Sequence, residues 1–115
     1  MTSLTTHVLD QASGLPGRNI AVDILKLEAG RRIALGTVST NSDGRTDAPL
    51  LTKAEPGTYE LVFHIGAYFQ AQGLSLTEPA FLDEVVIRFG LSDSHAHYHV
   101  PLLVSPYGYS AYRGS

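Results

Sequence analysis

Residues 59–73 read YELVFHIGAYFQAQG, and two local patterns follow one another within this stretch. In its first half, every odd-numbered position is apolar and alternates with Glu60, Val62 and His64, which is the period of a half-buried β-strand. The second half has few β-branched residues and ends on Gly73, the residue type that commonly follows the last turn of a helix. The stretch therefore predicts a strand followed directly by one short helix.

Similar alternation marks other short segments of the chain. Residues 84–89 alternate in the same way, and residues 4–11 and 31–40 read as further strands. One more strand begins at residues 20–24 and shifts its phase at Leu25, which indicates either a β-bulge or a strand buried on both faces. Turn signals rich in Gly, Pro, Asn and Asp separate these segments. Short strands punctuated in this way predict an all-β sandwich or barrel with a single helix.

Composition limits the classes of protein to consider. Of the 115 residues, 43% are hydrophobic and 17% charged, so residues 1–115 are expected to form a single globular domain. The formal net charge is -3 and the Lys and Arg residues are scattered, which argues against a nucleic-acid partner. Cys is absent, which excludes disulfides and thiolate chemistry. No run of about 18 apolar residues is present, and residues 1–10 are too polar for a signal peptide, so we expect a cytoplasmic protein without a membrane segment.

The segment HAHYHVPLLV, residues 95–104, has the most specific pattern in the chain. Strand side chains alternate between faces, so the even-numbered residues, all apolar or aromatic, are assigned to the core. His95, His97 and His99 then share the opposite face, which continues with the apolar Pro101. An outer face that combines imidazoles with apolar side chains predicts a pocket, a subunit interface, or both.

Three alternate His residues also raise the alternative of a metal-binding protein. Such residues lie roughly 7 Å apart along a strand and can share a cation. A catalytic zinc normally has three protein ligands, however, and Asp93 is the one acidic residue near His95, His97 and His99. The favoured interpretation is therefore a site without a required metal.

Three further features could contribute to a site. His7 lies near the start of the first predicted strand, and Arg45 follows the turn signal of residues 41–44, where a guanidinium could bind a carbonyl or carboxylate. The tail, residues 107–115, contains three Tyr and no disordered polar stretch. Such a tail is expected to be docked, because exposed aromatic rings lose burial energy. An edge strand at a subunit interface is a compatible alternative.

Three motifs, in the right order, resemble those of the 5-hydroxyisourate hydrolases, also called transthyretin-related proteins. The first is THVLD (residues 6–10) with GLP (residues 14–16), and the second is TNSDGR (residues 40–45). The third is the C-terminal run of residues 97–115, HYHVPLLVSPYGYSAYRGS, whose Tyr-Arg-Gly-Ser ending distinguishes this family from the hormone-carrying transthyretins. The resemblance covers nearly the whole chain.

The resemblance implies a transthyretin-like sandwich of two four-stranded sheets with its short helix near residues 66–73. It also implies a homotetramer, a dimer of dimers with active sites at the interface between dimers, and a reaction without a cofactor. The implied reaction opens the ring of 5-hydroxyisourate to 2-oxo-4-hydroxy-4-carboxy-5-ureidoimidazoline in urate breakdown. A carrier of a small ligand on the same scaffold is the alternative, because function depends on the site and not on the fold.

Carried over by motif, the implied catalytic residues are His7, Arg45, His99 and Ser115. The implied substrate-binding residues are His7, Arg45, His97, Tyr112, Arg113 and Gly114. A neutral imidazole can take a proton from water near pH 7, and a guanidinium can stabilise negative charge on the attacked carbonyl. The sequence does not divide water activation between His7 and His99.

Overall fold

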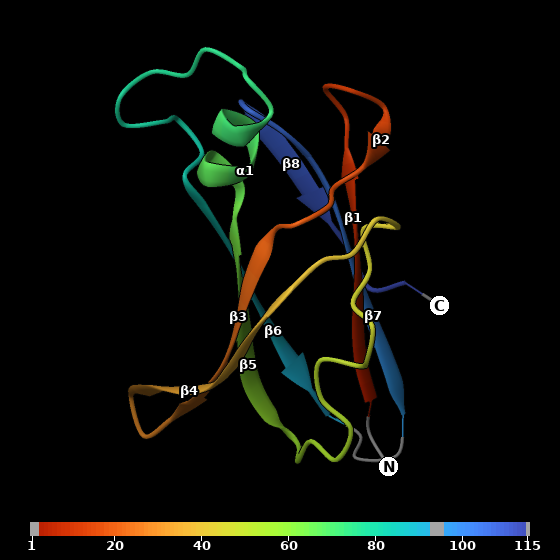
Figure 1. Ribbon diagram of the computed structural model, residues 1–115. Coiled ribbons are helices and arrows are strands. Elements are labelled where there is room, and N and C mark those ends of the chain that lie inside the picture. The colour runs from red at the N-terminus through yellow and green to blue at the C-terminus, as the bar shows by residue number, and fades with distance from the viewer. Residues whose placement is uncertain (1–2, 93–95, 115) are drawn as a thin grey trace.

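The computed structural model describes residues 3–92 and 96–114, which form two four-stranded β-sheets packed face to face (Figure 1). The first sheet has the order β2-β1-β7-β8 and comprises β1 (Ser3–Asp10), β2 (Leu15–Pro16), β7 (His97–Ser105) and β8 (Gly108–Ala111). The second has the order β4-β3-β5-β6 and comprises β3 (Ala21–Glu28), β4 (Arg31–Ser39), β5 (Gly57–His64) and β6 (Glu84–Leu91). The helix α1 (Ile65–Ala71) follows β5 directly. The predicted sandwich with one short helix is confirmed.

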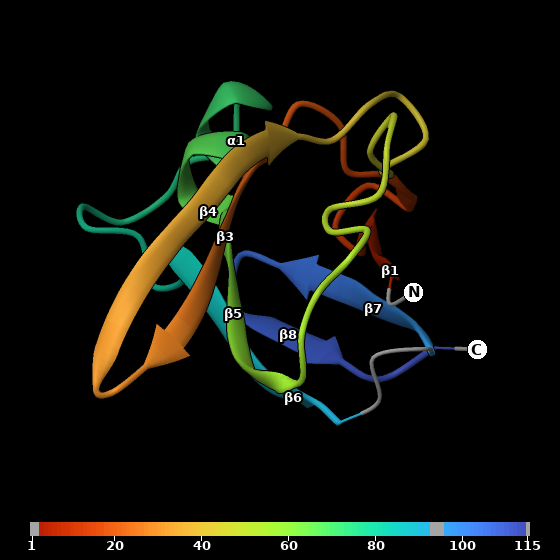
Figure 2. The same ribbon diagram turned by 90° about the horizontal axis from the view of Figure 1, so that it is seen from below.

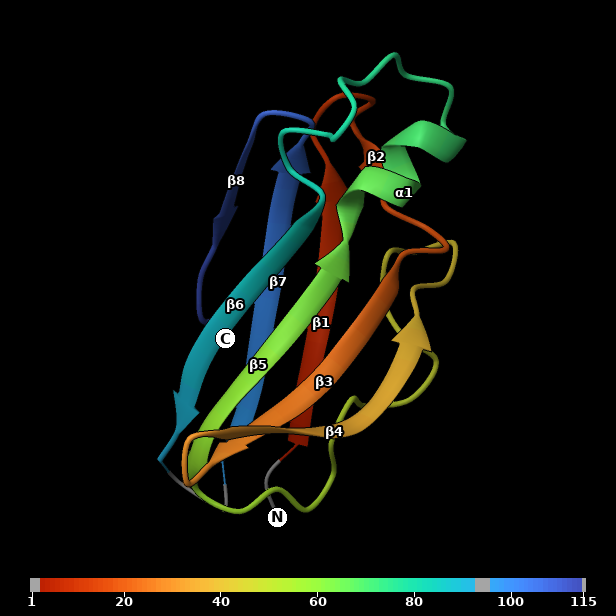
Figure 3. The same ribbon diagram turned by 90° about the vertical axis from the view of Figure 1, so that its left-hand side faces the viewer.

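In the first sheet, the first strand of the chain pairs with a strand close to its C-terminal end. Strands β1 and β7 run parallel, in register from Ser3 opposite His97 to Asp10 opposite Val104. The other strand pairs are antiparallel. Strands β6 and β8 end their respective sheets and lie on the same side of the sandwich (Figures 2 and 3). The chain therefore presents two sheet edges next to each other.

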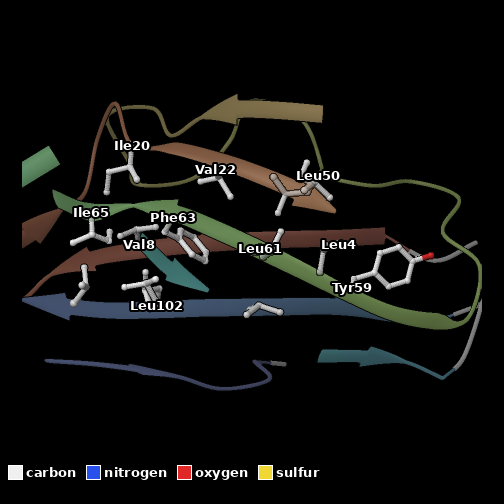
Figure 4. Packing of buried hydrophobic residues seen from close by; sticks show 14 of the residues in the cluster. Leu4, Val8, Ile20, Val22, Leu50, Tyr59, Leu61, Phe63, Ile65 and Leu102 are labelled. Atoms are coloured by element: carbon white, nitrogen blue, oxygen red, sulfur yellow. The ribbon is translucent and has the colours of Figure 1, made fainter. Parts of the chain in front are cut away.

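The core lies between the sheets and is built from inward-facing apolar side chains (Figure 4). Tyr59, Leu61 and Phe63 of β5 are at most 2% exposed, as their alternation predicted. Leu4 of β1 and Leu102 of β7 are completely buried against them from the other sheet. Burial of such apolar surface is the main stabilising term, at roughly 25 cal/mol per Å².

The outer face of β5 differs from the half-buried strand that the sequence predicted. Glu60 and Val62 are both only 3% exposed, although they point away from the core. The Glu60 carboxylate accepts hydrogen bonds from Arg32 Nε at 2.8 Å and Arg88 Nε at 2.9 Å, and these long side chains cover it. Burial alone would raise the pKa of Glu60, but the bonds from Arg88 and Arg32 hold that pKa below its ordinary value. Charged neighbours from β4 and β6 thus bury a face that alternation assigns to solvent.

The phase shift expected after residues 20–24 is a β-bulge. Ile24 lies opposite Gly36, and Leu25 lies opposite Ala34. Leu35 of β4 is therefore the additional residue, and the pairing of β3 with β5 continues without a shift. The bulge interpretation is confirmed, with the extra residue on the neighbouring strand.

The end of α1 is set by Gly73, as the sequence predicted. This residue has φ +84°, and its N–H donates to Gln70 O at 3.0 Å. The N–H of Leu74 donates to Phe69 O at 3.2 Å. These two bonds form a Schellman motif, which satisfies carbonyl groups at the helix end and requires a left-handed residue at this position.

Within the described residues, α1 is too short to cross a membrane, and no other helix is present that could do so. The cytoplasmic location stays a prediction.

Candidate functional site

The outer face of the first sheet brings together the predicted His residues. On β7, Tyr98 is buried on the core side, whereas His97 is exposed and His99 half-buried on the opposite face. The two-face assignment is thus confirmed for the described part of this stretch, and His95 lies outside the described residues. Parallel pairing sets Thr5 of β1 opposite His99 and sets His7 opposite Pro101. Residues about ninety positions apart in the sequence therefore share one surface.

The loop that carries Arg45 is fixed against β1. Asn41 Oδ1 accepts the backbone N–H of Arg45 at 3.2 Å, and Arg45 O accepts the N–H of Asn41 at 2.7 Å. The loop also includes Gly44, whose φ is +74° and whose carbonyl accepts the N–H of Val8 at 2.8 Å. A Cβ at Gly44 would lie 2.4 Å from Val8 O, so only glycine permits this approach. Arg45 consequently emerges beside the outer face of β1.

A pocket of about 440 Å³ lies between this loop and the His face. It is lined by Thr5, Thr6, Arg45, Thr46, Asp47, Ala48, Pro49, His97 and His99. The far end of the loop is tied to the start of β1, because Leu4 exchanges backbone hydrogen bonds with Leu50 and Leu51. A mostly polar hollow of this size, fixed at both ends, suits a small polar molecule.

Hydroxyl groups of β1 hold the two imidazoles. Thr5 Oγ1 lies 2.8 Å from His99 Nδ1 and 3.3 Å from His97 Nε2. Ser3 Oγ is hydrogen-bonded to His97 Nδ1. The bond to His99 Nδ1 orients this ring and leaves Nε2 as its other nitrogen for chemistry.

His7 and His99 are both biased towards their neutral forms. Partial burial, and then the nearby Arg45 guanidinium, lower the pKa of His7 below 6.5. The same two causes, in the same order, lower the pKa of His99, with smaller contributions from His7 and His97. Two imidazoles that interact electrostatically with each other and with Arg45 belong to one site, although His7 does not itself line the pocket. Neutral imidazoles are the form able to accept a proton.

The C-terminal tail reaches this site through Gly114. Its N–H donates to His99 O at 2.6 Å, and a Cβ there would lie 2.7 Å from His99 Cδ2. The tail backbone thus lies against the imidazole. Pro101, which has no N–H, lies between this bridge and the first β7–β8 ladder pair, Leu102 with Ala111.

The chain does not bring Tyr112 and Arg113 to the His face. Arg113 Cζ lies 4.2 Å from the ring centroid of Tyr98, which is on the core side of β7. Both tail residues line a separate hollow of about 280 Å³ that also includes Ile87 and Phe89 of β6. Their substrate-binding role stays a prediction, and Ser115 lies outside the described residues.

The tail is docked as β8, but its rings are not buried within one chain. Tyr107, Tyr109 and Tyr112 are 64%, 47% and 57% exposed. The expected ring burial is therefore wrong for the single chain, because the strand docks through backbone hydrogen bonds to β7. This arrangement matches the alternative of an edge strand.

Thr5 is the site residue that sequence reasoning missed. It shares a face with His7 at the two-residue period of a strand, which was the available signal. Its partners, however, are on β7, and the pairing of β1 with β7 is not visible in local sequence. Thr46 and Asp47 also line the pocket and were not predicted.

No group of three His, Cys, Asp or Glu side chains placed to hold a metal ion occurs among residues 3–92 and 96–114. His97 and His99 are bonded to β1 hydroxyls instead. The proposed trio with His95 extends beyond the residues described.

The comparisons with known proteins all point to one protein family. The model of the HIUase/Transthyretin family matches residues 4–114. The 5-hydroxyisourate hydrolase 2 of Rhizobium meliloti (strain 1021) is 57% identical over 97% of this chain and 95% of its own length. Klebsiella pneumoniae 5-hydroxyisourate hydrolase is 31% identical with a TM-score of 0.82, covering 98% of this chain and 99% of that one. The structure of an (S)-allantoin synthase is 39% identical with a TM-score of 0.93, and this chain, 99% covered, spans 44% of its length.

Proposed function

Because the chain belongs to the HIUase/Transthyretin family, we propose that it hydrolyses 5-hydroxyisourate to 2-oxo-4-hydroxy-4-carboxy-5-ureidoimidazoline. One observation carries the proposal at the level of the site. His99 and Arg45 line one polar pocket, and His7 lies on the same face of the sheet, opposite Pro101, which is two residues from His99 on β7. This set can bind an anionic or carbonyl-rich ring and accept a proton from water.

The reaction that we propose breaks the amide-like N1–C6 bond of the ring. A neutral imidazole, His7 or His99, takes a proton from water while the water oxygen bonds to C6. The carbonyl oxygen becomes negatively charged, and the Arg45 guanidinium stabilises this charge. The C6–N1 bond then breaks and N1 receives a proton, so that one water is added in total. No step requires a cofactor.

We also propose that the protein acts as a homotetramer with its sites at the interface between dimers. The adjacent edges of β6 and β8 offer a surface for pairing two chains. The outer His face continues with Leu9, which is 37% exposed and lies opposite Leu103. Apolar side chains beside an open pocket favour a second surface there.

The test is to generate 5-hydroxyisourate from urate with urate oxidase and to follow its decay by ultraviolet absorbance. Substoichiometric protein should accelerate this decay above the spontaneous rate. An unchanged decay rate with folded protein would remove the hydrolase proposal and would favour a carrier of small ligands. Activity lost on exhaustive chelation and restored by one metal would instead indicate a metal site.

Substitutions in the pocket test the residue roles. We expect Arg45→Ala and His99→Ala to lower turnover by at least about tenfold, because each removes a group that acts on the transition state. Arg31→Ala, on exposed β4 of the other sheet, is the matched control and should leave turnover unchanged. Wild-type turnover in an assembled Arg45→Ala protein would exclude Arg45 from the mechanism.

A further inference from the structure

Four side chains form an unbroken row on the outer face of the first sheet. Ser3 Oγ bonds to His97 Nδ1, and His97 Nε2 lies 3.3 Å from Thr5 Oγ1. Thr5 Oγ1 lies 2.8 Å from His99 Nδ1. The row runs from His99, which lines the pocket, through Thr5 and His97 to Ser3. His97 is exposed to solvent. The parallel register of β1 and β7 creates this row, because Ser3 pairs with His97 and Thr5 pairs with His99.

The hydrogens of this row are not independent. The Thr5 hydroxyl has a single hydrogen, and a neutral imidazole has one N–H and one bare nitrogen. If Thr5 donates to His97, then His99 Nδ1 must carry a hydrogen and donate to Thr5, which leaves His99 Nε2 bare. If Thr5 donates to His99, then His97 Nε2 must carry the hydrogen. Whenever Thr5 donates to one of the rings, the two rings therefore have the same tautomer, both Nδ1–H or both Nε2–H. If Thr5 instead accepts from both rings through its two lone pairs, the tautomers are opposite and the row transfers no proton.

We propose that Thr5 is a positioning residue that keeps Nε2 of His99 bare, and that the row Thr5, His97 and Ser3 relays a proton from His99 to solvent. This inference rests on the proposed hydrolase function and assigns water activation to His99. Thr5, His97 and Ser3 each receive a role in this proposal, although the hydrolysis step itself does not require them.

The relay balances in protons. As the water oxygen bonds to the substrate carbon, His99 Nε2 takes the water proton. The hydrogen on Nδ1 passes to Thr5 Oγ1, and the hydroxyl hydrogen of Thr5 passes to His97 Nε2. The hydrogen on His97 Nδ1 passes to Ser3 Oγ, whose own hydrogen goes to solvent. A second proton, brought in from solvent by His7, reaches the departing nitrogen, so the sum is the addition of one water. The row ends with both rings as Nε2–H. After the product leaves, His99 Nε2 gives its proton to solvent, Ser3 takes one up, and the hydrogens move back along the row to restore the Nδ1–H form.

Electrostatics explain why a relay helps at this site. Arg45 from the loop, His7 from β1 and His97 from its own strand disfavour a charged His99, and Asp47 lines the same pocket. A positively charged imidazole beside the Arg45 guanidinium is unfavourable. Passing the proton along the row lets His99 accept one from water without remaining charged. Thr5 has to hold the ring in the correct tautomer for this to work.

Nitrogen chemical shifts of the imidazoles test the tautomers without measuring activity. In the wild-type protein at pH 8, we expect both His97 and His99 to be in the Nδ1–H form. Thr5→Val keeps the side-chain shape but removes the hydroxyl, and it should move His99 towards the Nε2–H form that free imidazole prefers. Thr5→Ser keeps the hydroxyl and should keep the wild-type tautomer.

Thr6→Val is the matched control on the same strand. Thr6 also lines the pocket, but its hydroxyl donates to Val100 O at 2.7 Å and not to either imidazole, so the control is read from the tautomers and not from activity. Loss of this hydroxyl should lower stability without changing either tautomer. Opposite tautomers in the wild-type protein, or unchanged shifts in Thr5→Val, would overturn the proposal.

Kinetics provide the second readout. We expect Thr5→Val to lower kcat by about tenfold or more, within the range of a general-base step, with KM changed by less than about threefold. Thr5→Ser should recover most of the loss. Wild-type kcat in Thr5→Val would contradict the relay. If the wild-type protein does not hydrolyse 5-hydroxyisourate at all, the hydrolase proposal fails, while the nitrogen shifts still decide whether Thr5 sets the tautomer.

Discussion

Gly114 lies where an added side chain would meet the His99 ring. Its backbone N–H donates to His99 O, and the absence of a side chain lets the tail lie against the imidazole. Gly114→Ala would place a Cβ 2.7 Å from His99 Cδ2 and 3.3 Å from Pro101 Cγ. We expect turnover to fall by about tenfold or more, because a displacement of about 1 Å in a catalytic group has costs of this order. Steady-state kinetics on 5-hydroxyisourate would measure it.

The control for this substitution is Gly90→Ala. A Cβ at Gly90 of β6 meets no atom within 4 Å, so both turnover and stability should stay near the wild-type values. The thermal midpoint of Gly114→Ala should also stay within a few degrees of wild type, since the residue lies outside the core. Full activity of Gly114→Ala would show that the tail does not position His99.

The lowered pKa values of His7 and His99 predict the acid limb of the activity. Both pKa values lie below 6.5, first because of burial and second because of Arg45. His99 is the proposed base and acts in its neutral form, so its titration should leave more than half of the plateau activity at pH 6.5 and should remove it only at lower pH. A pH profile of kcat/KM, which reports the pKa values of the free enzyme, measures this, and a half-loss at or above pH 6.5 would contradict it.

The substitution Arg45→Gln separates the two causes of the lowered pKa values, burial and the Arg45 charge. Without the guanidinium, burial remains but the repulsion is gone, so the pKa of each His should rise towards 6.5. Proton NMR titration of the imidazole Cε1–H signals gives these values directly, including in variants with little activity. Arg31→Gln on β4 should leave them unchanged.

At the scale of elements, Tyr68 of α1 is tied to the end of β1 through Asp10. Tyr68 donates its hydroxyl hydrogen to Asp10 Oδ2 at 2.8 Å, and Asp10 is only 3% exposed. Asp10 Oδ1 accepts the backbone N–H groups of Ala12 and Ser13, which shapes the following turn. Tyr68→Phe leaves one buried oxygen without its donor and should cost about 1–3 kcal/mol of unfolding free energy. Urea denaturation measures this cost.

The pH dependence of that cost follows from the phenol. Burial, and then the hydrogen bond and charge of Asp10, raise the pKa of Tyr68 from 10.0 to about 12. A pKa raised by folding contributes stability that is complete below pH 10 and is lost as the pH rises towards 12. The difference between Tyr68→Phe and wild type should therefore shrink in this window. Tyr107→Phe, on an exposed ring, should change stability by less than about 0.5 kcal/mol at any of these pH values.

Structural features set by neighbouring residues could be predicted from the sequence. Features set by contacts with residues far away in the sequence could not. The alternation of β5, the Gly73 helix end and the turn before Arg45 follow from neighbouring residues. The burial of Glu60 depends on two Arg residues from other strands. Strand β2 has two residues and forms only because β1 offers an edge. Local periodicity contains no information on these partners.

The same distinction applies to the candidate site. Motif resemblance predicted His7, Arg45 and His99, and the fold brings the three together. It did not predict Thr5, because the bond from Thr5 to His99 exists only in the parallel register of β1 with β7. It also placed Tyr112 and Arg113 with the site, whereas in one chain they lie at the opposite face of the sheet, near β6.

At the scale of the whole molecule, the proposed tetramer would cover two exposed surfaces of the chain. Strands β6 and β8 end their sheets side by side, and the Tyr rings of the tail are exposed near them. The His face carries the neighbouring Leu9 and Leu103 on its outer side. Two separate surfaces, one of edges and one of a face, are what a dimer of dimers needs.

Leu103→Glu tests this assembly. A carboxylate on the His face would have to be buried without a partner if two dimers met there, so the substitution should convert tetramers to dimers in sedimentation velocity. The edges of β6 and β8 are unaffected, so dimers should persist. If the pocket is completed between dimers, turnover should fall together with the tetramer fraction and recover when that fraction rises at high protein concentration. A fully active dimer would show that each pocket works without the facing pair, and a wild-type protein that sediments as a monomer would remove the assembly proposal.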